Sequence, residues 1–306
     1  MNRFIGVFLL IPGLFLSTVG FAAPPGADHA RIMGPDACGE CHENEVDAWR
    51  LTPHATTFNE MHRRPEAEEI ATKLGIRRVR AESVCLDCHY TSQQPEGEAS
   101  SVIAGVSCES CHGASMDWIE VHNDYGPYGD RESEPEEHRL QRLASAIDAG
   151  MLNPGNLYDI AQNCYQCHLV PNERLVNTGG HPAGSPDFEL VSWLHGEVRH
   201  NFLRTDGSSN GDNDAARKRM LFVTGLILDL EHSLRGTAIA TERDVYGVTL
   251  ARRANAVRAR LGEINAAISS SELDEIVTIG SGVRLALNNR EELTQAADSI
   301  AQLGRA

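Results

Sequence analysis

The pattern of apolar positions is clearest in the last third of the chain. Met220 to Leu230 is apolar nearly all round, which predicts a buried segment too short to span a membrane. Ser269 with Glu272 and Asn289 with Glu292 resemble the capped starts of later helices. One apolar stripe recurs in steps of three and four, as on a single face of a helix: Leu250, Ala254, Val257, Leu261, Ile264 and Ile268. We therefore expect a helical region over 215–306.

Residues 31–205 show a different pattern, with many turn residues and little aliphatic material between short helical stretches. The polar, glycine-containing run TDGSSNGDND at 205–214 separates this part from the C-terminal helices, and we expect a linker at 206–214. Residues 24–30 form a flexible leader by the same criterion. The pattern predicts a mainly α protein, with one domain over 31–205 followed by the helical region.

The first residues have the layout of a secretory signal. Arg3 supplies a positive charge, Phe4 to Leu16 is almost wholly apolar, and small residues precede a cut near Ala22 or Ala23. An uncleaved anchor is the alternative, because apolar character continues to Ala23. We expect a cleavable signal peptide at 1–23 and a periplasmic protein, with a membrane tether as the other possibility.

All eight cysteines of the 306-residue chain fall into one pattern, C-x-x-C-H. The first motif is Cys38, Cys41 and His42; the second is Cys85, Cys88 and His89; the third is Cys108, Cys111 and His112; the fourth is Cys164, Cys167 and His168. Disulfides give no reason for the histidine, and four Cys-Cys-His sets are awkward to close into tetrahedral zinc sites. Covalent c-type haem explains every part, because two thiols reach the two vinyl groups and the adjacent histidine ligates iron. The sequence predicts four attached haems.

The formal charge of −16 argues against nucleic-acid binding, which needs a basic face. The charge is uneven, since 24–212 holds 14 Lys and Arg against 31 Asp and Glu, whereas 213–306 is neutral. Much of this acidity is solvated surface. A sharper interpretation is a field that steers a redox partner with a basic docking face toward the haems.

The histidines outside the motifs decide between an electron carrier and an enzyme. A haem with a second histidine is six-coordinate and binds no substrate, whereas an open iron binds small molecules. We expect surface or structural roles for His29, His62, His138 and His232. The remaining five histidines are candidate distal ligands: His54, His122, His181, His195 and His200.

The stretches CGECH, WRLTPHATTF, CLDCH, GVSCESCHG, and CYQCH with GGHPAGSPDFEL resemble the tetrahaem cytochrome c-554 family over roughly 34–205. The resemblance implies that His54 ligates the haem of the third motif and that His122 ligates the haem of the first. It also points to His200 for the fourth haem, with His195 as the rival. The second haem is five-coordinate in the best-known member, but here His181 either fills that position or is a turn histidine.

Three functions follow from these expectations. The first is a periplasmic tetrahaem carrier between a dehydrogenase and a downstream acceptor. The second is a haem oxidoreductase that acts on a small nitrogen or sulfur compound at an open second iron. The third is a haem subunit docked through its helical region on a larger redox complex. We favour the carrier, since no motif variant marks a catalytic haem and lysine occurs only at 73 and 218.

Overall fold

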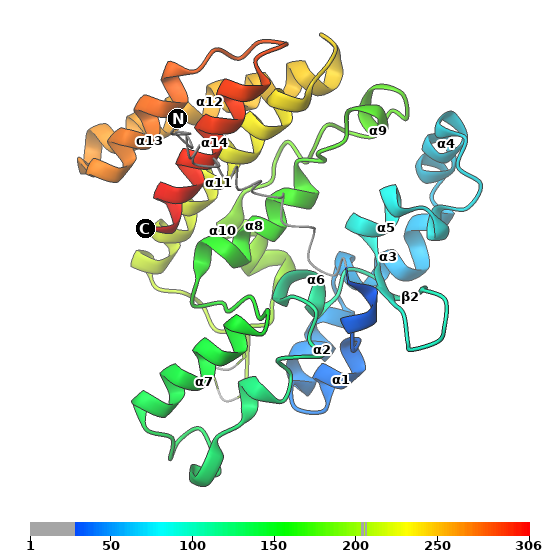
Figure 1. Cartoon of the computed structure of the whole chain (residues 1–306), viewed down its shortest axis with the longest axis vertical. Coiled ribbons are helices and arrows are strands. Elements are labelled where there is room, and N and C mark those ends of the chain that lie inside the picture. Colours follow the sequence, from blue (N-terminus) through cyan, green and yellow to red (C-terminus); the bar gives the residue numbers. More distant parts are fainter. Residues whose placement is uncertain (1–27, 203–204, 206) are drawn as a thin grey trace, which may run out of the picture.

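The computed structural model describes residues 28–202, 205 and 207–306. The expected signal peptide therefore lies outside the described residues. The first part of the chain is a series of short helices with one two-stranded hairpin (Figure 1). Its elements are α1 (Pro35–Gly39), α2 (Glu43–Arg50), α3 (Pro53–Glu60), α4 (Pro65–Leu74), α5 (Ser83–His89), β1 (Thr91–Gln93), β2 (Ser101–Ala104), α6 (Cys108–His112), α7 (Glu136–Asp148), α8 (Leu157–His168), α9 (Glu173–Asn177) and α10 (Leu190–Trp193).

Local sequence signals set the ends of several of these helices. Proline occupies the first turn of α1, α3 and α4, where its missing N–H costs nothing. Thr52 caps α3 by accepting a hydrogen bond from Ala55 N, and Gly75 ends α4 in the left-handed conformation. The mainly helical fold predicted from the sequence is confirmed.

Four longer helices form the C-terminal region: α11 (Ala215–Ile239), α12 (Val245–Ile268), α13 (Ser271–Gly282) and α14 (Arg290–Arg305). Helix α11 packs against α12, α14 and α8 (Figure 1). The predicted stripe is buried from Leu250 to Leu261, whereas Ile268 is 58% exposed because α12 ends there.

Three sequence details of this region need correction. Ser269 adopts a left-handed conformation that ends α12, and Ser270 is the residue whose side chain caps α13. Asn289 occupies the N-cap of α14, but its side chain donates to Arg284 O and makes no cap hydrogen bond. Met220 is 57% exposed, although Leu221 beside it is buried as expected, because only one side of this turn of α11 faces the core.

The largest apolar core joins the fourth motif to the C-terminal helices. Tyr158 and Tyr165 of α8 pack in one cluster with Leu228 of α11, Leu261 of α12 and Ile300 of α14. The core therefore continues across the expected linker at 206–214, and the division of the chain into domains stays a prediction. None of the described helices is long and apolar enough to cross a membrane.

Candidate functional site

The four motifs lie on short helices or at helix ends. The second and third motifs occupy α5 and α6, the fourth ends α8, and the first spans α1 and the turn after it. Helical spacing brings the two thiols of a motif to the same side, because residues three apart are neighbours on a helix. All eight cysteines lie among the described residues and have free thiols, so the disulfide alternative is wrong for this structure.

Each motif histidine faces one histidine from a distant part of the chain. His42 faces His122 with 6.3 Å between ring centres, and His54 faces His168 at 6.2 Å. His89 faces His181 and His112 faces His200, both at 6.3 Å. The angles between ring planes range from 28° to 86°, so the constant quantity is the distance and not a stacking geometry.

This distance matches two imidazoles on opposite sides of one metal ion. A metal–imidazole bond is about 2.0 Å long and the ring nitrogen lies about 1.15 Å from the ring centre, so two such rings have centres about 6.3 Å apart. The described residues contain no group of three or more His, Cys, Asp or Glu side chains that could hold a bare metal ion. The donor set therefore fits haem iron, whose four equatorial ligands come from the porphyrin.

In four of the eight paired histidines, a backbone carbonyl holds the Nδ1 atom. Backbone carbonyls accept from Nδ1 of His112 (Leu152 O, 3.2 Å), His122 (Ile119 O, 2.5 Å), His181 (Pro182 O, 2.8 Å) and His200 (Val198 O, 3.1 Å). A proton fixed on Nδ1 leaves Nε2 with a free lone pair for a metal. These carbonyl contacts were not foreseen, since a backbone acceptor leaves no signal in the sequence.

Burial keeps three of the motif imidazoles neutral, which is the form that binds metal. Desolvation lowers the pKa of His89, His112 and His168 to about 4 in each case. Burial also raises the pKa of the Cys111 thiol to about 11 and that of Cys164 to about 12. These two thiols and three imidazoles are thus shielded from water.

The motifs themselves come together in a definite order. The Cys38 thiol of the first motif is close enough to hydrogen-bond to Cys108 of the third. Cys111 of the third motif interacts electrostatically with Cys164 of the fourth, and Cys167 hydrogen-bonds to Cys88 of the second. The order in space is therefore first, third, fourth, second.

Two of the four expected pairings are reversed in the structure. His122 faces the first motif, as the resemblance implies, and His181, for which a turn role was the alternative, faces the second. His54 faces the fourth motif and His200 faces the third. The backbone of His54 is bound directly to the segment before the third motif, where its carbonyl accepts from Val106 N at 3.0 Å. We attribute the reversal to this contact, because a histidine bound beside a motif cannot reach the far side of the same haem.

His195 faces none of the four motifs. Its Nδ1 donates to Val191 O at 2.8 Å, and its Nε2 lies 3.1 Å from Asn213 Nδ2. A π-helix over Leu194–Val198 and a left-handed Arg199 separate it from His200, so the two do not share a regular helix.

Three of the other four histidines have local partners or lie in the core, whereas Nδ1 of His62 is buried without a hydrogen-bond partner. His29 contacts Ser100, His138 contacts Glu134, and His232 is buried against Tyr165 with ring centres 6.2 Å apart.

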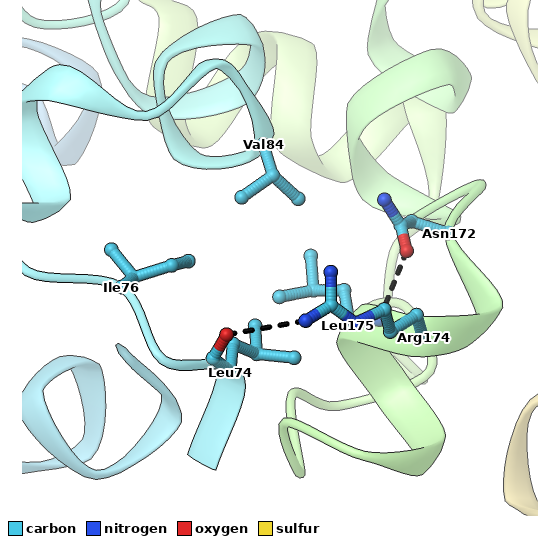
Figure 2. Close-up of a pocket in the computed structure, with 6 residues that line it drawn as sticks. All are labelled: Leu74, Ile76, Val84, Asn172, Arg174 and Leu175. Carbon is cyan, nitrogen blue, oxygen red and sulfur yellow. Dashed lines mark hydrogen bonds between the residues drawn. The ribbon is translucent and has the colours of Figure 1, made fainter. Parts of the chain in front are cut away.

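A small apolar cavity of about 150 Å³ lies beside the second motif, between α4, α5 and α9 (Figure 2). It is lined by Leu74, Ile76, Val84, Asn172, Arg174 and Leu175. Arg174 closes one side by donating to Leu74 O at 3.2 Å. None of the thiols or paired histidines lines it, so the cavity is separate from the four sites.

Comparison with known proteins supports the haem-attachment interpretation of the motifs. The family model described as cytochrome c554 and c-prime matches residues 37–113, which contain the first three motifs. Cytochrome c-554 of Nitrosomonas europaea is 23% identical over 180 residues, which are 55% of this chain and 69% of that protein. No solved structure matches the chain.

The motifs and these matches define a c-type cytochrome, an electron-transfer protein with covalently bound haem. Its first three motifs resemble those of the cytochrome c-554 family.

Proposed function

We propose that the chain is a periplasmic tetrahaem cytochrome that carries electrons between a dehydrogenase and a downstream acceptor. The observation that carries the proposal is the set of four histidine pairs at 6.2–6.3 Å, one for each C-x-x-C-H motif. Each bound haem supplies an iron that alternates between the ferric and ferrous states. The residues Cys38, Cys41, Cys85, Cys88, Cys108, Cys111, Cys164 and Cys167 attach the four haems, and the paired histidines ligate the irons.

The number of haems is directly measurable. The mature protein should weigh as much as the processed polypeptide plus four porphyrins, and low-temperature electron paramagnetic resonance of the oxidised form should show four low-spin irons. A mass with fewer porphyrins, or high-spin iron in a haem-replete sample, contradicts the proposal.

A carrier is favoured over an enzyme by His181. Its ring lies 6.3 Å from that of His89, so the second motif has the same paired arrangement as the other three. Two histidines at each motif would hold the iron of a bound haem and leave no position for a substrate, so the haem would supply electron exchange only. The alternative, a haem oxidoreductase acting at an open second iron, requires His181 to lie elsewhere.

Carbon monoxide distinguishes these two functions. The reduced wild-type protein should show no Soret shift on addition of carbon monoxide, and H181A should show a shift of one haem equivalent. The H195A variant is the matched control and should behave as wild type, because His195 faces no motif. A one-haem shift in the wild-type protein would favour the enzyme.

The first motif lies at one end of the spatial order of the four motifs, and we expect a redox partner to dock there. Cys41 is exposed and the His42 side chain is 46% exposed. A groove of about 330 Å³ beside it is lined by acidic residues together with one basic and two apolar ones: Asp36, Gly39, Glu40, Glu43, Val46, Asp47 and Arg50. This charge supports a redox partner with a basic face that approaches the first haem.

Charge substitutions test the docking surface. E40Q/E43Q removes two exposed charges from the groove and should slow electron transfer from a basic partner at low ionic strength. The rate should also depend less on salt. The matched control E291Q/E292Q removes two exposed charges from α14 and should leave the rate unchanged. Equal effects of the two variants would refute a docking surface at the first motif.

Export is the remaining part of the proposal. The layout of residues 1–23 supports cleavage near Ala22 or Ala23, and attachment of c-type haem fits a secreted protein. N-terminal sequencing of the mature protein tests this, since retention of Met1 would favour an anchored form.

A further inference from the structure

The C-terminal helices reach the fourth motif through a network of buried charge. His168 Nδ1 lies 3.1 Å from Ser185 Oγ, and Ser185 N donates to His168 O at 2.8 Å. On the other side, Ser185 O accepts a hydrogen bond of 2.9 Å from Arg253 Nη1. The segment that carries Ser185 thus joins the motif imidazole to a guanidinium on α12.

The guanidinium is fixed in place by α11. Arg253 donates from Nε and Nη2 to the two carboxylate oxygens of Asp229, at 2.7 and 2.8 Å. The two side chains are only 15% and 10% exposed, and Ser233 Oγ donates to Asp229 at 3.1 Å. A forked pair with this little exposure has a defined position and is weakly screened by salt.

Aromatic rings set the orientation of the same imidazole. Phe188 stacks on His168 with ring centres 4.5 Å apart and planes 7° from parallel, and Trp193 meets the ring edge-on at 5.0 Å. Phe188 is buried in the core shared with the C-terminal helices. The orientation of His168 and the charge near it therefore both depend on this region.

We infer that the C-terminal helices tune the fourth haem, with Arg253 as a positioning residue that holds a cationic charge, balanced by Asp229, behind the His168 imidazole. The inference rests on the proposed function. A cationic charge near an iron favours the ferrous state, and an anionic charge favours the ferric state. The Arg253–Asp229 pair therefore balances these two opposing effects at the fourth haem.

Substitutions of opposite charge give the test, measured by spectroelectrochemical titration of the haem-loaded full-length protein. R253Q leaves the Asp229 carboxylate uncompensated and should lower one midpoint potential. D229N leaves the guanidinium uncompensated and should raise the same potential, and R253Q/D229N should return it toward the wild-type value. The matched control is R260Q, which removes an exposed arginine of α12 that pairs with exposed Glu263, and it should shift no potential.

Two further variants keep the test decisive. The affected wave should be missing in C164A/C167A, which lacks the fourth haem. S185A removes only a hydroxyl and leaves the bond from Arg253 to Ser185 O in place, so it tests the contact of this segment with His168 even where the charge variants do not fold. It should raise the same potential because His168 loses its Nδ1 acceptor. Single charge variants that shift the potential in the same direction, or an unshifted potential in S185A, would overturn the inference. The proposed function fails separately, through a haem count below four or an open iron in the wild-type protein.

Discussion

The pairing of His54 with the fourth motif leads to a prediction that pairing of His54 with the third motif would not satisfy. The His54 and His168 ring centres are 6.2 Å apart, so an iron midway between them lies about 3.1 Å from each centre, which is one metal–nitrogen bond plus the distance inside the ring. Substitution of His54 by alanine removes every atom that can reach this position. H54A should therefore convert one of four low-spin irons to a form that binds carbon monoxide.

Combination with haem-deletion variants identifies which iron is opened. In C164A/C167A, which lacks the fourth haem, H54A should add no further carbon monoxide binding. In C108A/C111A, which lacks the third haem, H54A should still add one haem equivalent. H200A should give the opposite results in the same two backgrounds.

The assay is carbon monoxide titration of the reduced proteins, followed in the Soret band, with haem content measured for every variant. The reasoning is refuted if H54A opens an additional iron in the absence of the fourth haem. It is equally refuted if H54A opens none in the absence of the third.

Two stability predictions concern the carboxylates of Glu109, inside the third motif, and Glu134, before α7. E109A should lower the free energy of unfolding by about 3–5 kcal/mol, because it leaves four hydrogen-bond donors without their buried acceptor. A guanidinium titration that shows a loss below about 1 kcal/mol would contradict this. The hydrogen bond from Arg142 lowers the pKa of Glu134 from 4.5 to about 2. The ionised Glu134 therefore contributes its full stabilisation of the fold above pH 4.5, and this stabilisation is lost as the pH falls toward 2. Acid unfolding of wild type and E134Q should therefore differ near neutral pH and converge below about pH 2, and a gap that widens on acidification would contradict the assignment.

The Glu109 network also shows how the first and third motifs are held together. This residue of the third motif is fully buried and accepts from Met33 N and Gly34 N, just before α1. It accepts as well from the backbone and hydroxyl of Ser115. Gly34 has a φ of +91°, a conformation that suits glycine and turns its N–H toward the carboxylate. A single side chain thus fixes one motif against another.

Much of the local structure could be predicted from sequence. The C-x-x-C-H motifs are local patterns, and the stripe from Leu250 to Leu261 follows from helical periodicity. The cap at Ser270 was misplaced by one residue, since two adjacent serines offer equivalent hydroxyls and only the left-handed turn at Ser269 decides between them.

The pairing of histidines was only half predictable, and the reason is geometric. The two members of each pair are eighty or more residues apart, with His42 and His122 the least separated. Sequence gives the list of available imidazoles but not the direction in which each one points. For His54 that direction depends on the contact of its carbonyl with Val106 N, which no residue type encodes.

The same long separations explain why the first part of the chain needs its cofactors as part of its core. Most of its helices are shorter than three turns, and isolated helices of that length are marginal in water. The large apolar cluster belongs to α8 and the C-terminal helices, and it leaves α1 to α6 with only scattered buried residues. Each haem bound as proposed would join a thiol pair to a histidine from a distant segment, so the four sites would supply the long-range contacts that aliphatic side chains supply elsewhere. Electron transfer and folding of this part would then depend on the same groups.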